Sequence, residues 1–350
     1  MDFLLREWLF ISSALGLIFT SFYLGSFPSY EFKDIIPIFL LFVFFIVVKG
    51  IENSYFLLRV AYLLEKGKWL SFKLVLITFF LSMFVTIDVS LITMLPVVLS
   101  LKVENKENLA ILVALTAHVG AALTPFGTPQ NLFIYSYYNV NTYDFITSIS
   151  PFSFGMLLFF SIISLFMDKK NSSVKNKKKD IDKNKAIIYI FLLIIMILSL
   201  LRVLPQSVSL FVFAFVLIFD KKSLRVDYPL LLTFVIFVGL TFNIKEMISG
   251  SIHQSGHIFL LSSLISQFIS NVPTALLFEK FTSNWEALLW GTNVGGFGSL
   301  IAALANLITY KLYISYGDQN RAGIFTFKFL FAGYISFFIA TVIYFIVFYQ

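Results

Sequence analysis

The chain of 350 residues contains no cysteine and little charge, and each shortage excludes a class of protein. Without cysteine there is no disulfide, no thiolate nucleophile and no cysteine ligand for a metal. Charged residues make up only 13% and hydrophobic residues 59%, whereas soluble globular chains are about a quarter charged and about half apolar. Too little polar material remains to cover a surface that faces water. The composition therefore excludes cytosolic enzymes, secreted domains and nucleic-acid binders, and it predicts a protein embedded in lipid.

Sequence patterns of known catalytic centres are also missing. The chain has no His-Glu-x-x-His, no Gly-x-Ser-x-Gly, no phosphate-binding loop and no aspartate-rich diphosphate pattern. His253 and His257 have the spacing of a helical metal pair, but Gly256 intervenes and no carboxylate lies between them. With only three histidines in the chain, we expect neither an enzyme nor a resident cofactor.

Nine apolar runs approach or exceed the length that crosses a bilayer, which is about 20 residues in a helix. They are 8–24, 35–48, 108–140, 145–167, 186–203, 206–219, 229–243, 285–314 and 324–348. The runs 108–140 and 285–314 are long and interrupted, so we expect helices that are broken near the bilayer midplane. Segments 71–101 and 257–281 each hold two half-length stretches, which predicts two re-entrant hairpins. The expected fold class is an all-α polytopic membrane protein.

Lysine and arginine predict the orientation, because cytoplasmic loops carry an excess of both. With the N-terminus inside and each hairpin returning to its own side, all but four of the 26 Lys and Arg residues fall inside. The four outer residues are Lys33, Arg202, Lys245 and Lys280. We expect a multi-pass protein of the cell (inner) membrane, with a cytoplasmic N-terminus and an external C-terminus. The Lys-rich run 168–185 cannot pack, which predicts a cytoplasmic linker, with docking of a partner or of anionic lipid as the alternative.

The linker separates two halves, residues 1–167 and 186–350, that repeat one pattern. Residues 118–132 align with 293–307 at a constant separation of 175, and Val, Gly, Asn and Leu coincide. The hairpin interruptions at 86–90 and 270–274 align at a separation of 184. In the expected topology the two hairpins open to opposite sides, so the halves are inverted repeats. Secondary transporters have this architecture, and they bind their ligands near the midplane where hairpin tips and helix breaks meet.

Four segments carry a resemblance to a known family. The hairpin tips read Thr86-Ile87-Asp88 and Ser270-Asn271-Val272-Pro273. The breaks read Gly127-Thr128-Pro129-Gln130-Asn131-Leu132 and Gly298-Ser299-Leu300, the latter followed by Leu304-Ala305-Asn306-Leu307. These segments resemble the ion transporter superfamily, in the branch of arsenical pump membrane proteins and NhaD-type sodium/proton antiporters, which has a citrate transporter-like domain. Divalent-anion/sodium symporters are more distant relatives. The resemblance implies transport of an ion by alternating access.

Two positions depart from the family pattern, and both lie in the first half. Ile87 stands where the family usually has Asn, and His118 stands where the second half has Asn293. An Ile side chain offers no oxygen to sodium, so a sodium site is expected only at Ser270, Asn271 and Asn293. In the first half we expect Asp88 and His118 to meet near the midplane and to carry a proton instead.

The candidate binding residues share a place at a hairpin tip or a helix break. They are Thr86, Asp88, Ser90, His118, Thr124, Asn131, Ser270, Asn271, Thr274, Asn293, Ser299 and Asn306. Structural roles stay open beside the binding roles. Asp88 is an ion or proton site or a cap for exposed amides, and His118 titrates or only bonds a carbonyl. Asn131 and Asn306 coordinate substrate or hold the breaks open. No Lys or Arg is expected near the tips.

The function expected from these features is secondary active transport of a small inorganic ion or oxyanion, arsenite-like or another anion, with protons as the expected coupling ion. The alternatives are a sodium/proton antiporter and a sodium-coupled carrier of dicarboxylate or citrate type, with a channel or membrane enzyme more remote. The coupling ion is H⁺ or Na⁺. The expected partners are the substrate and membrane lipid, with a homodimer and a separate ATPase subunit left open.

The expected orientation is directly testable because the chain has no cysteine to remove. A single Cys placed in the run 168–185 should react with a membrane-permeant reagent and resist an impermeant one added to intact cells. A Cys at the C-terminus should react with both reagents. Labelling of the linker from outside would overturn this orientation.

Overall fold

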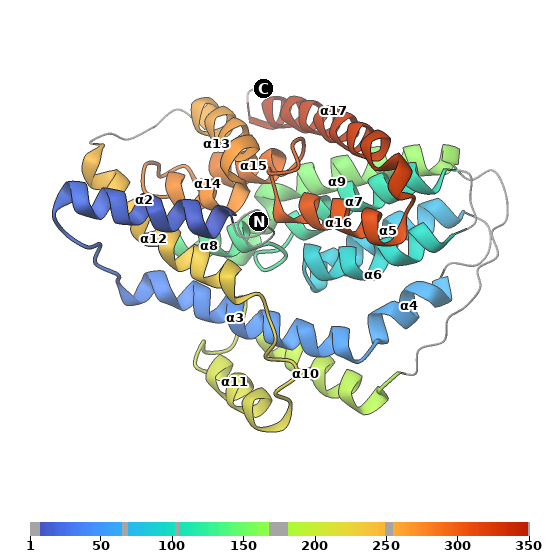
Figure 1. Cartoon of the computed structure of the whole chain (residues 1–350), viewed down its shortest axis with the longest axis horizontal. Helices are drawn as coiled ribbons and strands as arrows, with labels where there is room; N and C mark the ends of the chain where they lie inside the picture. The colour runs from blue at the N-terminus through green and yellow to red at the C-terminus, as the bar shows by residue number, and fades with distance from the viewer. Residues whose placement is uncertain (1–7, 65–68, 102–104, 168–180, 249–254, 349–350) are drawn as a thin grey trace.

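The computed structural model describes residues 8–64, 69–101, 105–167, 181–248 and 255–348, and within these ranges the fold is helical without a strand (Figure 1). The helices of the uninterrupted apolar runs are α2 (Trp8–Leu24), α3 (Phe32–Asn53), α9 (Thr142–Met167), α10 (Lys183–Leu200), α11 (Val208–Phe219), α12 (Tyr228–Met247) and α17 (Ala322–Phe348). A short α4 (Phe56–Leu64), which the sequence did not predict, follows α3. The all-α fold class is confirmed.

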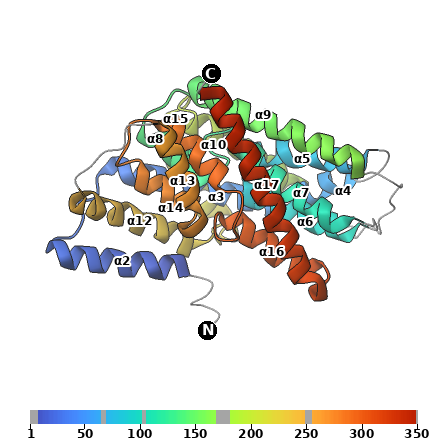
Figure 2. The same ribbon diagram turned by 90° about the horizontal axis from the view of Figure 1, so that it is seen from above.

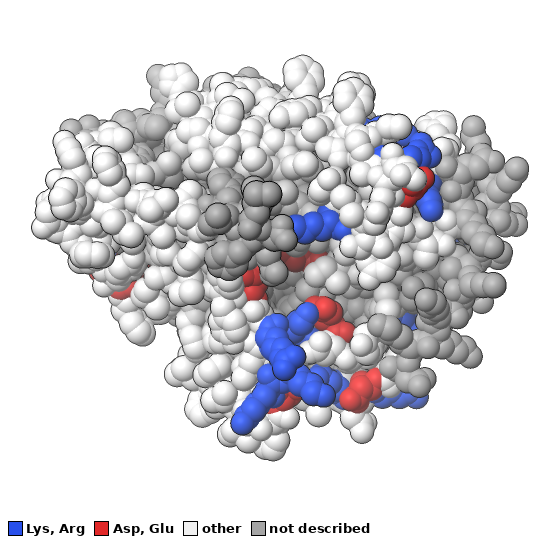
Figure 3. Space-filling view, viewed as in Figure 1, with Lys and Arg blue, Asp and Glu red and all other residues white. Residues whose placement is uncertain are grey.

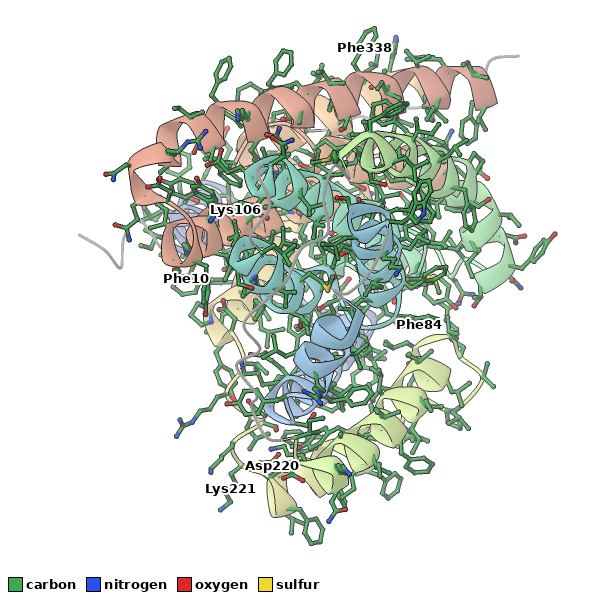
Figure 4. All side chains as sticks on the ribbon, turned by 90° about the vertical axis from the view of Figure 1, so that its right-hand side faces the viewer. Phe10, Phe84, Lys106, Asp220, Lys221 and Phe338 are labelled. Carbon is green, nitrogen blue, oxygen red and sulfur yellow. The ribbon has the colours of Figure 1, made fainter. Side chains whose placement is uncertain are left out.

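Large apolar side chains cover much of the outside of the molecule, as expected for a protein that is surrounded by lipid. Phe22 on α2, Phe211 on α11 and Phe338 on α17 are each at least 68% exposed. Figure 4 shows Phe338 pointing outward from α17. Among the described helices, α3, α9, α10, α12 and the segment Gln319–Phe348 are each long and apolar enough to cross a membrane. The chain is an integral membrane protein.

Each segment expected to form a hairpin is a pair of helices with an abrupt turn between them. The first pair is α5 (Leu70–Phe84) and α6 (Ile87–Ser100), and the second is α13 (Ser255–Ile269) and α14 (Asn271–Phe278). Thr86 caps α6, because its side chain accepts a hydrogen bond from the Val89 amide. Ser270 turns the second pair with a φ of 76°, a left-handed conformation that side chains rarely adopt.

Each long interrupted run is a helix with a break. The first consists of α7 (Lys106–Ala122) and α8 (Pro129–Tyr137), and the second of α15 (Trp285–Gly295) and α16 (Leu304–Tyr316). Pro129 starts α8, where its missing N–H costs nothing. The two broken helices run in opposite directions. The Tyr313 hydroxyl of α16 donates to Glu107 at the start of α7, and the Tyr138 hydroxyl, just after α8, donates to the Thr282 carbonyl just before α15.

The helices pack into two groups. The hairpin bundle comprises α5–α9 and α13–α17 and has its own apolar core. The α3 group comprises α3, α10, α11 and α12, with α2 packed on α12. Figure 2 shows α17 crossing the hairpin bundle obliquely and α2 at the edge beside α12. Side chains next to the tips and breaks, among them Phe126, Phe133 and Val272, belong to the core of the α3 group. These contacts form a seam between the two groups.

The two ends of the seam carry different charges, and α3 runs from one end to the other. We call the end that holds Asn53 and Asp220 the linker end, and the opposite end, which holds Asp34 and Lys280, the Lys280 end. At the linker end, Lys185 Nζ lies 2.6 Å from Asp220 Oδ2, which also accepts from Tyr189 and Ser223. Burial raises the pKa of Asp220, but these hydrogen bonds outweigh it and lower the pKa to about 2. Asp220 and Lys221 are labelled in Figure 4.

The expected linker 168–185 is only partly described. Residues 168–180 lie outside the described ranges, as does His253 of the histidine pair. Asp182 caps α10 by accepting from the Lys185 amide, so the helix begins at Lys183 and takes the last three residues of that run. Within the described ranges, no group of three or more metal-binding side chains is found.

Candidate functional site

Two asparagines hold the helix breaks open. In the first break, Asn131 Nδ2 donates to the carbonyls of Ala122 and Thr124, at 3.0 and 3.1 Å. In the second, Asn306 Nδ2 donates to the carbonyls of Gly296 and Ser299, at 3.0 and 2.8 Å. Thr124 and Ser299, like Asn131 and Asn306, are separated by 175 positions. Each amide thus pairs backbone carbonyls that the helix end leaves without a partner, where a buried, unpaired group would be costly.

The same asparagines join the two halves through a reciprocal pair of bonds. His118 Nε2 lies 2.8 Å from Asn306 Oδ1, and Asn293 Nδ2 donates to Asn131 Oδ1, also at 2.8 Å. His118 and Asn293 are themselves 175 positions apart, so each bond is the counterpart of the other. All four side chains are buried. Such an exchange of partners is the contact pattern of a two-fold axis.

Each hairpin tip is tied by its backbone to the break that follows it. The Ile87 amide donates to the Gly127 carbonyl at 3.3 Å, and the Asn271 amide donates to the Ala302 carbonyl at 2.9 Å. The hydroxyls of Thr124 and Ser299 donate to carbonyls near the end of α5 and α13, those of Met83 and Gln267. Again the partners match between the halves at separations of 184 and 175. Both tips are therefore fixed against their breaks in the same way.

Polar side chains from both halves meet around Gly296. A Cβ added to this glycine would lie 3.2 Å from Asn271 Nδ2 and 3.3 Å from His118 Nδ1. Among the residues expected to hold sodium, Ser270 Oγ lies 3.5 Å from Asn271 Oδ1. The Asn293 amide nitrogen is committed to Asn131 and to the Leu289 carbonyl. Asn293 therefore offers only its oxygen to an ion.

Both tips line a cleft at the linker end of the seam. One cavity of about 400 Å³ is bordered by Ser270, Asp227 and Lys311. A second, of about 190 Å³, is bordered by Thr86 and Asp88. The two share Asp227, Leu230, Leu304 and Ile308, and together they form what we call the linker-end cleft. Charged side chains of both signs surround the hollow near the centre of Figure 3.

The expectation that no Lys or Arg lies near the tips is wrong. Lys49 and Arg225 border the same cavity as Thr86 and Asp88, and Lys311 borders the cavity of Ser270. Lys49 is paired with Glu52 at 2.9 Å. Within the described ranges, no ion-pair partner is found for Arg225, which is exposed to the cleft. From the sequence, Lys49 and Arg225 were expected only at the membrane surface. Nothing in the sequence showed that α3 and the start of α12 lie beside a hairpin tip.

Asp88 and His118 have different surroundings, although the sequence led us to expect a pair. Asp88 is half-buried at the start of α6 and borders the cleft. His118 bonds Asn306 and packs against the Phe297 ring, with ring centroids 5.7 Å apart. No hydrogen bond or ion pair joins the two side chains within the described part of the chain. Ser90 and Thr274 point inward and donate to the Thr78 and Ser270 carbonyls.

One buried hydroxyl at the first break was not among the predicted site residues. Thr128 precedes α8 and is 4% exposed, and its Oγ1 has no hydrogen-bond partner within the described residues. It lies within the stretch Gly127-Thr128-Pro129, but its counterpart in the second half is Ala303, so the repeat did not single it out. An unpaired buried hydroxyl is available to a ligand.

Helices with a lipid-facing exterior, paired half-helices and a cleft with charged side chains at their tips define a polytopic membrane transporter. The citrate transporter family, CitMHS, matches residues 8–290, and the chain belongs to that family. The chain is similar to an uncharacterized transporter of Methanocaldococcus jannaschii, with 33% identity over 79% of this chain and 80% of the relative. It is also similar to the inner membrane protein YbiR of Escherichia coli, with 31% identity over 68% of each chain. The resemblance stated from the four segments is confirmed at the level of this family.

The hydrogen bonds at the breaks predict which site residues matter for stability. Asn306→Ala leaves two buried carbonyls and the His118 ring without their partner, so unfolding should become easier by several kcal/mol, about 1–3 for each unpaired group. His118→Asn should stay close to wild type, because Asn293 makes the equivalent bond in the other half. Thermal unfolding of the purified variants in detergent checks both statements. Equal stability of Asn306→Ala and wild type would contradict the role given to these amides.

Proposed function

We propose that the protein is a secondary active transporter that carries a small carboxylate anion by alternating access. The observation that supports this most is the linker-end cleft, where both hairpin tips meet three basic side chains. The hydroxyls of Thr86 and Ser270 at the tips offer hydrogen bonds, while Lys49, Arg225 and Lys311 offer positive charge. Glu52, Asp88 and Asp227 also border the cleft, and Lys49 is paired with Glu52, so Arg225, which has no ion-pair partner among the described residues, is the basic group most available to an anion. The family's name, citrate transporter, points to the same class of substrate.

The position of the cavities at the two ends of the seam supports alternating access. The linker-end cleft borders the C-terminal part of α3, whereas a separate cavity of about 350 Å³ borders Lys33, Asp34 and Pro37 at its beginning. Phe133 borders the latter cavity and packs edge-to-face on Phe234 of the cleft, with ring centroids 5.5 Å apart. In our proposal, movement of the hairpin bundle along the α3 group shifts this aromatic barrier and exposes the tips to either side.

The two halves act in this scheme as inverted repeats. The matched bonds at separations of 175 and 184, and the opposite directions of the two broken helices, support that relation. A two-fold relation gives two equivalent conformations in which the halves exchange roles, and each opens the site to one side. We take the linker end as cytoplasmic, because the Lys-rich run leads into α10 there. The Lys280 end then faces outside.

The tips are the first place to test transport. Ser270→Ala and Asn271→Ala should each abolish uptake into proteoliposomes while the protein stays inserted and folded. Each hydrogen bond to a charged ligand is worth about 1.5–3 kcal/mol, which is about a tenfold to a hundredfold loss of affinity. Arg225→Gln should raise the substrate concentration needed for half-maximal uptake.

The matched control is Ser315→Ala on α16, whose hydroxyl bonds only the Lys311 carbonyl at the exposed end of the helix. It should transport like wild type. The uptake screen includes citrate, dicarboxylates, arsenite and sodium. Near-normal transport in both tip variants would move the site elsewhere, and uptake of arsenite alone would replace the proposed substrate class.

A proton, and not sodium, is the proposed coupling ion, because Ile87 removes an oxygen from the first tip. Uptake should respond to an imposed pH gradient and be indifferent to a sodium gradient. His118→Asn restores the residue found in the second half and should change the pH dependence of uptake if His118 takes part. Strict sodium dependence in the wild type would exclude proton coupling. An unchanged pH profile in His118→Asn would leave His118 with its structural bond to Asn306 only.

A further inference from the structure

The cavity at the Lys280 end contains a buried group of charges that does not balance. Asp34 belongs to α3, while Glu279 and Lys280 directly follow α14 of the second hairpin. Lys280 Nζ lies 3.4 Å from Asp34 Oδ1 and 4.0 Å from Glu279 Oε1, and each of the three side chains is at most 6% exposed. Two carboxylates thus share one ammonium group. When all three are ionised, the cluster carries one uncompensated negative charge out of contact with water.

The two carboxylates differ in their hydrogen-bond and ion-pair partners. Asp34 Oδ1 accepts from Lys280, and Asp34 Oδ2 accepts from the Glu31 amide at 3.0 Å. Glu279 has only the longer contact to Lys280, and its Oε2 is buried without any hydrogen-bond partner in the described residues. An unpaired carboxylate oxygen in such a place is strongly disfavoured, because the group loses its hydration without compensation. The side chain borders the 350 Å³ cavity, so a ligand from that cavity has access to it.

The described parts of the neighbouring elements supply no second cation for Glu279. Lys33 also borders the cavity, but it is exposed and pairs with Glu31 at 2.8 Å. Tyr137 ends α8, and its ring lies 4.5 Å from Lys280 Nζ, while the next residue, Tyr138, donates its hydroxyl to the Glu279 backbone carbonyl. Helix α12 contributes two apolar side chains to this region, Val238 and Phe242.

A proton on Glu279 fits the charges and contacts of this cluster better than a metal cation does. One proton on Glu279 makes the cluster neutral and turns the group into a donor. Sodium would need a shell of several oxygens, and it would lie close to the Lys280 ammonium. Moreover, the cluster spans the seam, since Asp34 is on the α3 group and the other two residues are on the hairpin bundle. Any sliding of the bundle separates Lys280 from Asp34.

We propose that Glu279 is the site where the transporter takes up and releases its coupling proton on the Lys280 side. In the present conformation Lys280 is nearer to Asp34, and Glu279 holds the proton. When the hairpin bundle moves, Lys280 loses Asp34 and turns to Glu279, which then releases its proton into the cavity as a hydrated proton. Proton occupancy and conformation are linked through the one shared lysine. This inference rests on the proposed alternating access, but the protonation state can be measured without any substrate.

Infrared spectroscopy of the purified wild-type protein tests this directly, through the C=O stretch that only a protonated carboxyl shows. At neutral pH the spectrum of the wild type minus that of Glu279→Gln should contain this band, since the contributions of other protonated carboxyls, such as Asp88, cancel in the difference. The band should persist in Glu286→Gln, a matched change on α15 seven residues further along. Asp34→Asn frees Lys280 to pair with Glu279, so the signal should be lost there too, although Glu279 is present. A difference spectrum without this band, or an Asp34→Asn variant whose band is as strong as that of the wild type, would overturn the proposal.

Transport assays give a second readout, which separates a role of Glu279 in proton coupling from a role in substrate binding. In Glu279→Gln, uptake driven by a pH gradient should fall to background, while exchange of labelled for unlabelled substrate across the membrane continues. Loss of both processes together with normal folding would assign Glu279 to the substrate path and overturn its role in coupling. If the wild type carries none of the screened substrates, the proposed substrate class fails, whereas the infrared result for Glu279 stands on its own.

Discussion

The whole arrangement depends on two buried asparagine side chains, each of which replaces hydrogen bonds that a broken helix has lost. A helix that stops inside an apolar bundle exposes carbonyls that no water can reach, and such carbonyls are tolerated only with a partner. Asn131 and Asn306 supply that partner within their own half, and each uses its oxygen to hold the opposite half. Once the breaks are stable, the short helices α8 and α16 can begin at the level of the tips, and a polar site can exist at membrane depth.

Small residues permit the close approach that these bonds need. A Cβ at Gly120 would collide with the Phe79 carbonyl of α5, and one at Gly295 would collide with Ser266 of α13. The two glycines are again 175 positions apart, so the hairpins lie against the broken helices at equivalent points. Close packing of hairpin on helix joins these helices into one bundle, which meets the α3 group through the apolar side chains of the seam.

Much of the fold could be predicted from local patterns, because a membrane leaves few choices. Apolar runs become helices, and the polar interruptions at Thr86 and Ser270 become turns, since lipid forbids exposed backbone. The candidate site was predicted only in part. Asn131, Asn306 and His118 were singled out by the internal repeat, but repetition alone did not separate a structural amide from a binding one. Thr124 and Ser299, also on that list, prove to fasten the breaks to the hairpins.

The charged residues missed by the sequence share one cause, which is that their neighbours are distant in the chain. Lys49 and Arg225 look like surface charges until α3 and the start of α12 are placed beside the first tip. Glu279 and Lys280 look like an ion pair that ends a hairpin, until Asp34, almost 250 positions away, takes the lysine. Charge balance in a buried cluster is a property of three dimensions, and no spacing rule along the sequence encodes it.

The reciprocal bonds between the halves also set the order in which the protein can mature. As the chain is synthesised, residues 1–167 enter the membrane before residues 293–306 exist. Until the later segment is present, His118 and the oxygen of Asn131 lack their partners Asn306 and Asn293. A half-length chain therefore cannot satisfy all of its buried polar groups. During biogenesis the first half therefore lacks these hydrogen bonds at first, and they form only when the second half has been inserted.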